Sequence, residues 1–286
     1  MYALSPAHRN TLSWTPGPRT EQCRAIRGST SARGTCDTSK HSSTISHASR
    51  NSFTSSNSGT QQQSVLQRAF ANPPQWAPFL GSLAVAGAAL GTALDGIHSR
   101  VGLQVYDLAP VQWGPLTTSL LVPPLLLTFY VVLGLLACTA DNLTAGSSAT
   151  AAARRRMNPH ESGSSAPAYL AACFGVLALN LYVSASFFHA ETPPAEIFWV
   201  LGALAAVNWT CFDGTNQGVW LGLMCAVGAP AAELLLMSVT GCWHYSRPDL
   251  AGVFVSWVPL CYLFYVPAVS NLARYLWHTC RLPVQK

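Results

Sequence analysis

Two ionisable side chains at helical spacing are the first candidates for chemistry. Asp95 and His98 stand three residues apart near the end of an apolar stretch. Side chains at that spacing lie on one face of a helix. A carboxylate beside an imidazole can bind a metal ion or transfer a proton. The alternative interpretation is a polar helix end that meets water beside Arg100.

Two further polar residues lie inside apolar stretches. Glu233 stands in one of them and Asn180 in another. A carboxylate within a membrane costs roughly a few kcal/mol and usually faces a partner or a cavity. Glu233 could pair with a cation, bind a ligand hydroxyl or carry a proton, and Asn180 could hydrogen-bond a neighbouring helix or a ligand. We take both as candidate ligand-binding residues.

The sequence contains no recognisable catalytic motif. HExxH, GxSxG and P-loop patterns are absent, and none of the nine cysteines forms the CxxC spacing of zinc and redox sites. We therefore predict a protein that is not an enzyme, with no catalytic residues, no metal and no cofactor other than a bound lipid. The alternative hypothesis is a small transporter or intramembrane enzyme that uses Asp95, His98 and Glu233.

The composition indicates a membrane protein. Of 286 residues, 50% are hydrophobic and only 9% are charged, whereas an ordinary soluble domain is about 25% charged. So few charges exclude a soluble single domain, a nucleic-acid-binding protein and a coiled coil. They favour a polytopic membrane protein.

The N-terminal part has a different composition. Residues 1–75 contain 8 Lys or Arg, 2 acidic residues and 23 Ser or Thr. Such a segment cannot bury enough apolar surface to fold by itself, so we predict a disordered tail over 1–75 and a membrane domain over 76–286. A Ser-rich, Arg-rich and acid-poor N-terminus is also typical of an organelle transit peptide. The alternative is therefore a plastid-envelope protein with a cleaved tail.

Six stretches of the membrane domain are long and apolar enough for helices that cross a bilayer, which takes about 20 residues each. Their length and lack of alternation favour helices over a transmembrane barrel. The predicted fold is all-α, a six-helix transmembrane bundle. The stretches are Phe79 to Ile97, Leu116 to Cys138, Pro167 to Phe188, Ala195 to Phe212, Gln217 to Thr240, and Val253 to Leu276.

The basic residues predict an orientation. With six crossings, 14 Lys and Arg fall on one side, including Arg154, Arg155 and Arg156, and 2 fall on the other, Arg100 and Arg247. The positive-inside rule then places both termini in the cytosol. The longest loop, from Thr139 to Ala166, is rich in Ala and Ser, and we expect it to be mobile.

Small residues and prolines predict how the helices pack. Gly87 with Gly91, and Gly218 with Gly222, are spaced by four and allow close approach of helix backbones. Pro123 and Pro124 fall inside the second stretch and should kink or break that helix, as should Pro230, Pro259 and Pro267 in later ones. Irregular helices of this kind suit a bundle that holds a ligand, so Pro123 and Pro124 join the candidate ligand-binding residues.

A spaced set of residues resembles the INSIG family, the insulin-induced gene proteins of the endoplasmic reticulum. The resemblance covers about residues 80–280 and leaves the tail outside. The residues that carry it are Pro123, Pro124, Gly134, Asp141, Asp213, Gly218, Gly222, Tyr245, Pro248, Asp249, Ser256, Trp257, Pro259, Asn271 and Arg274.

The resemblance implies a non-enzymatic adaptor of the endoplasmic reticulum membrane. It implies six helices, cytosolic termini, and a sterol or similar lipid bound among the helices. It also implies partners with a sterol-sensing domain, which the adaptor retains or marks for degradation to regulate sterol and lipid synthesis. Such an adaptor couples lipid binding to partner binding and needs no reaction centre.

Two positions bear on partner binding and on turnover. Asp213 occupies the position that the family associates with partner binding, although Asp213-Gly-Thr-Asn could equally cap the following helix. Arg154-Arg155-Arg156 stands where family members carry lysines that receive ubiquitin. The same control of turnover is therefore not expected.

Overall fold

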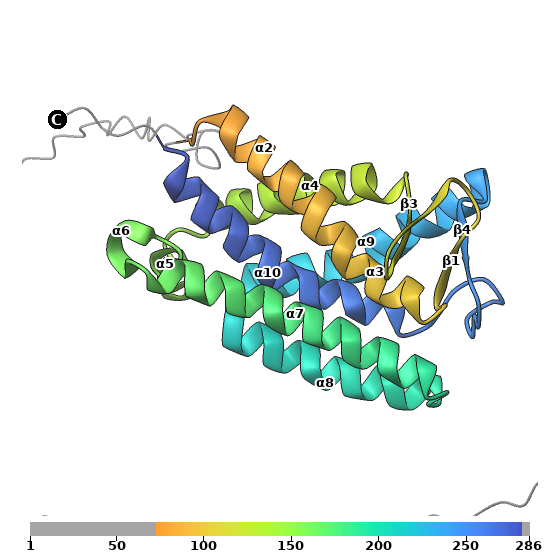
Figure 1. Cartoon of the computed structure of the whole chain (residues 1–286). Helices are drawn as coiled ribbons and strands as arrows, with labels where there is room; N and C mark the ends of the chain where they lie inside the picture. Colours follow the sequence, from red (N-terminus) through yellow and green to blue (C-terminus); the bar gives the residue numbers. More distant parts are fainter. Residues whose placement is uncertain (1–72, 282–286) are drawn as a thin grey trace, which may run out of the picture. The chain divides into compact units, whose positions relative to one another are not determined.

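The computed structural model describes residues 73–281. The predicted tail, 1–75, lies outside the described residues except for its last three. The described chain is mainly helical, with four short strands (Figure 1). Its elements are α2 Trp76–Ala86, η1 Gly87–Gly91, α3 Thr92–Arg100, β1 Gln104–Tyr106, β2 Pro110–Trp113, β3 Leu116–Ser119, α4 Val122–Leu143, α5 Ser148–Arg156, α6 Pro159–Ser162, α7 Ser165–His189, α8 Pro194–Phe212, α9 Asn216–Thr240, β4 Trp243–Tyr245 and α10 Val258–Thr279.

Within this part of the chain, five helices are long and apolar enough to cross a membrane. The first is the continuous segment α2–η1–α3, and the others are α4, α7, α8 and α9. Together with its composition, these spans make the chain a multi-pass membrane protein, as predicted.

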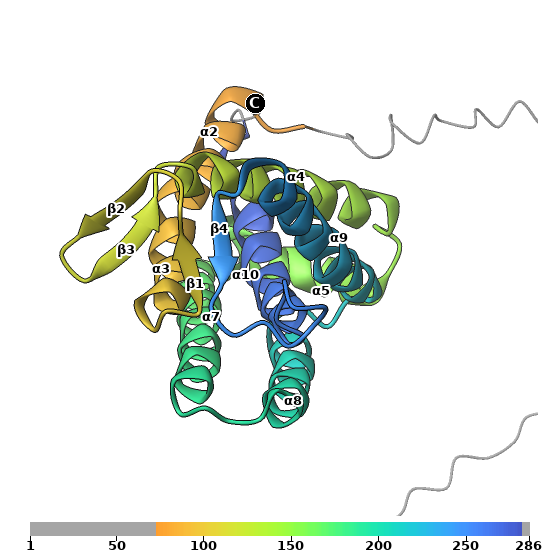
Figure 2. The ribbon, with the colours of Figure 1, turned by 90° about the vertical axis from the view of Figure 1, so that its right-hand side faces the viewer.

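The sixth predicted helix exists but differs from the other five. Helix α10 packs against α9, α4, α7 and α8 and lies among them when the molecule is turned by 90° (Figure 2). Because protein surrounds it, α10 does not need to be apolar on every face. It therefore carries buried polar residues, including Ser270, Asn271 and Arg274.

Two predictions about prolines were wrong. Pro123 and Pro124 do not break a helix, because they occupy the first turn of α4. Pro259 likewise lies in the first turn of α10. The first turn of a helix tolerates proline because its N–H groups have no partner within the helix. Pro230 and Pro267 do lie inside helices, as predicted.

The strands were not predicted from the sequence. Leu116–Ser119, expected to begin a helix, is strand β3 and pairs with β2 in a hairpin. Strand β1 pairs with β4, with Gln104 opposite Tyr245. This second pair joins the α3–α4 connection to the α9–α10 connection, so segments about 140 residues apart lie side by side.

The expectation of a mobile loop from Thr139 to Ala166 was also wrong. The segment contains the end of α4 and the short helices α5 and α6. Thr150, Ala153 and Met157 are fully buried in it. This connection is therefore a packed part of the domain.

The small residues act as the spacing predicted. A methyl group added at Gly87 would collide with the backbone carbonyl of Leu126 in α4. One added at Gly222 would lie 3.2 Å from Leu263 of α10, and one at Gly218 would meet the Asp213 carboxylate. The α2–η1–α3 segment and α9 therefore approach their neighbours more closely than a larger residue would permit.

The basic residues separate toward the two ends of the bundle. Helix α5, which carries Arg154 to Arg156, lies near the end of α10 (Figure 1). Arg100 ends α3, and Arg247 lies beside Glu191 in the α7–α8 connection, 3.4 Å away. The described residues therefore show the two-ended distribution on which the predicted orientation depends.

Candidate functional site

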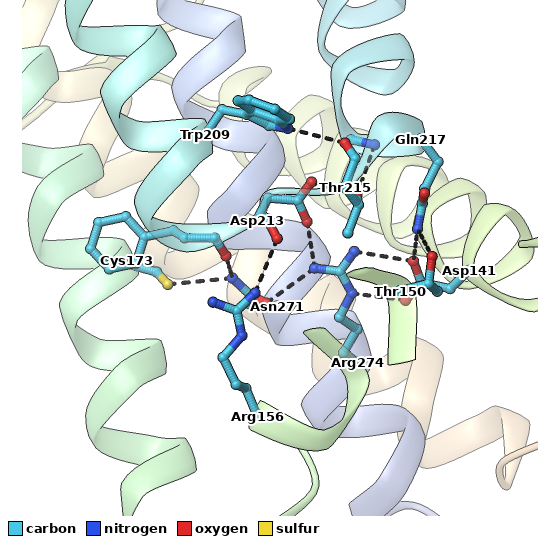
Figure 3. A network of polar contacts seen from close by, with 12 residues as sticks. Asp141, Thr150, Arg156, Cys173, Trp209, Asp213, Thr215, Gln217, Asn271 and Arg274 are labelled. Carbon is cyan, nitrogen blue, oxygen red and sulfur yellow. Dashed lines mark hydrogen bonds and ion pairs between the residues drawn. The ribbon is translucent and has the colours of Figure 1, made fainter. Parts of the chain in front are cut away.

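A buried arginine organises one end of the bundle. Arg274 of α10 donates from Nε and Nη2 to the two carboxylate oxygens of Asp141 at 2.8 and 3.1 Å, and from Nη1 to Asp213 at 2.6 Å (Figure 3). The exposed fractions of the three side chains are 3% or less. A planar guanidinium suits this geometry because it can donate to one carboxylate through two nitrogens.

A neutral donor, Gln217, completes the hydrogen bonding of Asp141. Gln217 Nε2 donates to Asp141 at 3.0 Å and to the Thr150 hydroxyl at 2.8 Å. The contact joins the start of α9 to α4 and to α5. Because a buried carboxylate is costly unless its oxygens are hydrogen-bonded, these contacts stabilise the position of Asp141 in the interior.

The Asp213 side chain is held at the turn between α8 and α9. Thr215 donates to its second oxygen at 2.7 Å and also accepts a hydrogen bond from the Gly218 N–H at 3.0 Å, which caps α9. Trp209 donates to the Thr215 carbonyl at 3.1 Å. The predicted helix cap is therefore made by Thr215, and Asp213 positions it.

Two more residues link the arginine to α7 and α8. Asn271 accepts from Arg274 at 3.2 Å and donates to the carbonyl of Phe212 at 2.7 Å. Arg156 donates to the carbonyl of Asp213 at 3.0 Å and to the Tyr169 hydroxyl at 2.9 Å. We call Arg274, Asp141, Asp213, Gln217, Thr150, Thr215, Asn271 and Arg156 the Arg274 cluster.

The Arg274 cluster brings into contact several residues that carry the resemblance to the INSIG family. Asp141, Asp213, Asn271 and Arg274 are far apart in the chain but in contact in the fold, and Gly218 lies against them. Asp213, the predicted partner-binding residue, is only 2% exposed. Its carboxylate thus faces the protein interior, and any effect on a partner must act through the shape of the α8–α9 turn.

Gln217 and Thr150 were missed in the sequence, whereas Thr215 was considered only as part of a helix cap and Arg156 only for its charge. One signal was available, because an arginine inside an apolar stretch, Arg274, needs a partner. Which neutral side chains would supply the remaining hydrogen bonds depends on the packing of α5 and the α8–α9 turn. The sequence did not predict that packing.

A second polar group lies toward the other end of the bundle. Asp95, His98 and Glu233 line a cavity of about 50 Å³, which we call the Glu233 cavity. This volume has room for a few water molecules. The side chains come from α3 and α9, so the fold brings together two carboxylates that the sequence had placed in separate helices.

Tyrosines surround the two carboxylates. Tyr245 and Tyr262 donate to Glu233 at 2.9 and 2.5 Å, and Tyr106 donates to Asp95. Burial, together with the neighbouring carboxylate charge, raises the pKa of Tyr106 and of Tyr245 above the ordinary value. Both hydroxyls therefore stay protonated and remain hydrogen-bond donors.

The hypothesis of a transporter or enzyme built on Asp95, His98 and Glu233 gains a shared location, but its chemistry stays a prediction. Within residues 73–281 no group of three His, Cys, Asp or Glu side chains could hold a metal ion. His98 Nε2 lies 2.7 Å from the Ser184 hydroxyl. The cavity therefore offers polar binding groups but no metal site among the described residues.

The remaining candidate residues have varied positions. Asn180 is buried in α7, and Pro123 and Pro124 begin α4.

Asp249 accepts hydrogen bonds from the backbone N–H and the hydroxyl of Ser256 at 2.8 and 2.5 Å, which closes the loop before α10. Trp257 is buried in edge contact with His98, and Gly134 is buried elsewhere, in α4 against Leu83 of α2. Pro248 belongs to the same loop as Asp249.

The fold is similar to that of solved Insig homologues. A crystal structure of the mycobacterial Insig homologue MvINS from Mycobacterium vanbaalenii has a TM-score of 0.52 and 18% sequence identity, and covers 72% of this chain and 96% of its own. A structure described as a cross-linked MvINS trimer has a TM-score of 0.54 and 19% identity, with the same coverage. No protein-family model matches the sequence, and no curated protein matches it. The chain therefore has an Insig-like fold.

Proposed function

We propose that this Insig-like membrane protein is a lipid- or sterol-responsive adaptor and not an enzyme. It binds membrane partners that carry a sterol-sensing domain, retains or marks them, and thereby regulates sterol and lipid synthesis. It resides in the endoplasmic reticulum membrane with both termini in the cytosol.

One observation carries the proposal. Four of the fifteen residues that carry the resemblance to the INSIG family, Asp141, Asp213, Asn271 and Arg274, converge in the Arg274 cluster, in a bundle whose fold is Insig-like. Asp141, Asp213, Asn271 and Arg274 join α4, the α8–α9 turn and α10 at the end of the bundle that carries Arg154 to Arg156. A partner that docks at this end meets a rigid surface, because buried ion pairs and their hydrogen bonds fix the three elements relative to each other.

The outer faces of α8 and α9 support a role in binding lipids or membrane partners. Trp199 is 74% exposed in α8, and Trp220 and Val227 are 68% and 72% exposed in α9. These faces meet lipid tails or a second membrane protein. A sterol held between such a face and a partner would couple the two binding events through its own binding free energy. The Glu233 cavity is too small for a whole sterol, so the lipid in this proposal lies on these outer faces.

The decisive experiment is a crosslinked pull-down of the full chain from membranes with sterol added or depleted, followed by mass spectrometry. We expect a membrane partner whose recovery changes severalfold with sterol. We expect Asp213→Ala to lose that partner, because the α8–α9 turn loses the bonds to Arg274 and Thr215. Asp107→Asn is the matched control, since Asp107 is half exposed and pairs with His244 away from the Arg274 cluster.

The pull-down can also contradict the adaptor function. If no partner is recovered under either sterol condition while the chain remains folded, the adaptor function is wrong. Saturable binding of a labelled sterol or diacyl lipid to detergent-solubilised protein is the second expected result. It separates loss of lipid binding from loss of partner binding.

A further inference from the structure

The Glu233 cavity combines two carboxylates with a lining that lacks a permanent cation. Asp95 and Glu233 line it, and none of its lining residues, all within 73–281, is lysine or arginine. Burying carboxylate charge without a counter-charge is costly. The tyrosine hydroxyls offset part of this cost through hydrogen bonds, but they carry no positive charge. A positively charged occupant would therefore be stabilised in the cavity.

Two buried polar side chains in the same lining have no partner among the described residues. Tyr265 is 6% exposed and Gln104 is 8% exposed, and both line the cavity. Neither the Tyr265 hydroxyl nor the Gln104 amide hydrogen-bonds any residue that the structure describes. Buried polar groups are normally hydrogen-bonded, so these two side chains are free to bond an occupant of the cavity, whether water or a ligand. Each can present an oxygen lone pair to an N–H donor.

Aromatic rings form much of the remaining wall. Phe129, Tyr245, Tyr262 and Tyr265 line the cavity. The ring of Phe129 stands edge-to-face to those of Tyr262 and Tyr265, with centroids 5.9 and 5.7 Å away. Aromatic faces attract organic cations through their quadrupoles. Carboxylates, acceptor oxygens and aromatic rings together are the groups that recognise an ammonium group.

The size and depth of the cavity fit such a group. A volume of about 50 Å³ suits an ammonium group with its first carbon atoms and not a large molecule. Glu233 lies seven residues before the end of α9 at Thr240, which is about 10 Å along a helix. With α9 taken as a span that ends at the headgroups, this distance corresponds to the outer part of the hydrocarbon layer.

We propose that the Glu233 cavity binds a primary alkylammonium group through Asp95, Glu233 and the aromatic side chains around them. The ammonium group donates to the two carboxylates and to the acceptor oxygens of Tyr265 and Gln104. Its source is either the ethanolamine headgroup of a membrane lipid or a free amine. This inference does not rest on the adaptor function, since the Arg274 cluster takes no part in it.

The test uses ethanolamine as the probe and ethylene glycol as its neutral analogue, with the full chain in detergent. We expect saturable binding of ethanolamine by titration calorimetry or ligand-observed NMR, and none of ethylene glycol. Glu233→Gln and Asp95→Asn should each weaken binding about tenfold or more, because each removes a charged acceptor. Tyr265→Phe should weaken it severalfold. Asp107→Asn removes an exposed carboxylate outside the cavity and should leave binding unchanged.

Folding of each variant is checked by gel filtration and by the melting temperature, and Glu233→Gln retains an oxygen that can accept from Tyr245 or Tyr262. If the wild-type protein binds ethanolamine no better than ethylene glycol, the proposal is wrong. It is equally wrong if folded Glu233→Gln and Asp95→Asn bind as wild type does. Either result would mean that the carboxyl groups are balanced by protons.

Lipid nanodiscs separate the two sources of the ammonium group. If the natural ligand is a lipid headgroup, phosphatidylethanolamine in the nanodisc should compete with free ethanolamine, and phosphatidylglycerol should not. If the natural ligand is a free amine, ethanolamine should bind equally in both membranes. Both outcomes support an ammonium site, and the first identifies its ligand as lipid.

Discussion

Arg274 holds its charge in the interior because two carboxylates and an amide surround its guanidinium group. Asp141 and Asp213 approach it from α4 and from the α8–α9 turn, and Asn271 lies one helical turn before it. In a medium without water, each member depends on the others, since a lone buried charge has no solvent to stabilise it. A buried ion pair of this kind fixes geometry more than it adds net stability.

Replacing Arg274 by methionine should therefore destabilise the bundle. The aliphatic side chain fills similar space but leaves Asp141 and Asp213 without a cation. Breaking a buried pair in this way costs roughly 3–5 kcal/mol, and the melting temperature in detergent should fall clearly. Arg100→Met is the matched control, because Arg100 is exposed and donates to one backbone carbonyl. Equal melting temperatures for the two variants would contradict the central role of Arg274.

At the scale of elements, close backbone approach decides the position of the first membrane segment. Helix α2 continues through the π-helical segment η1, whose two ends are Gly87 and Gly91, into α3. Both glycines are buried, and they face Leu126 of α4. Without side chains at these positions, the two helices can pack with little separation.

Two glycines in this segment give a matched pair of variants. Gly87→Ala should lower the melting temperature, since its methyl group would collide with the Leu126 carbonyl. Gly81→Ala should keep or raise it, because nothing lies within 4 Å of an added methyl at Gly81 and alanine favours a helix by up to about 1 kcal/mol over glycine. Thermal unfolding in detergent compares them. A loss for both variants, or for neither, would contradict the close packing of η1 against α4.

At the scale of the whole molecule, α10 differs from the helices that surround it. Five described helices are apolar enough to cross a membrane, whereas α10 packs against all five and carries buried polar residues. The outer helices separate α10 from lipid, so its polar side chains meet protein. A central helix with the least apolar sequence is the expected result of this arrangement.

The predicted orientation can be tested with single cysteines in a chain whose other cysteines have been replaced. Gln112→Cys lies in strand β2 at one end of the bundle, and Ala145→Cys lies between α4 and α5 at the other. In cells whose plasma membrane alone is permeabilised, a membrane-impermeant maleimide should label Ala145→Cys and not Gln112→Cys. The positive-inside rule places Arg154 to Arg156, and with them position 145, in the cytosol.

Other labelling patterns would contradict the predicted orientation or the number of crossings. Labelling of Gln112→Cys alone would reverse the orientation while preserving the opposite placement of the two ends. Labelling of both positions before the inner membranes are opened would contradict the number of crossings. Full permeabilisation should expose both cysteines and serves as the control for their reactivity.

The sequence by itself determined the membrane class, the approximate positions of the helices and the separation of basic residues. These depend on local composition and length, because a helix must be apolar over about 30 Å to cross the bilayer and basic residues are retained on the cytosolic side. It also provided the residues of the INSIG resemblance. It misjudged Pro123, Pro124 and Pro259, because a proline breaks a helix interior but suits a first turn, and only the observed helix starts distinguish these cases.

Only the tertiary structure decided which polar residues meet. Arg274 contacts Asp141 across 133 positions of sequence, and Asp95 and Glu233 share a cavity although they lie in different helices. The pairing of β1 with β4 brings Tyr106 and Tyr245 beside those two carboxylates. Contacts of this kind arise from the packing of whole helices around α10. Their partners are set by three-dimensional distance and not by spacing along the chain.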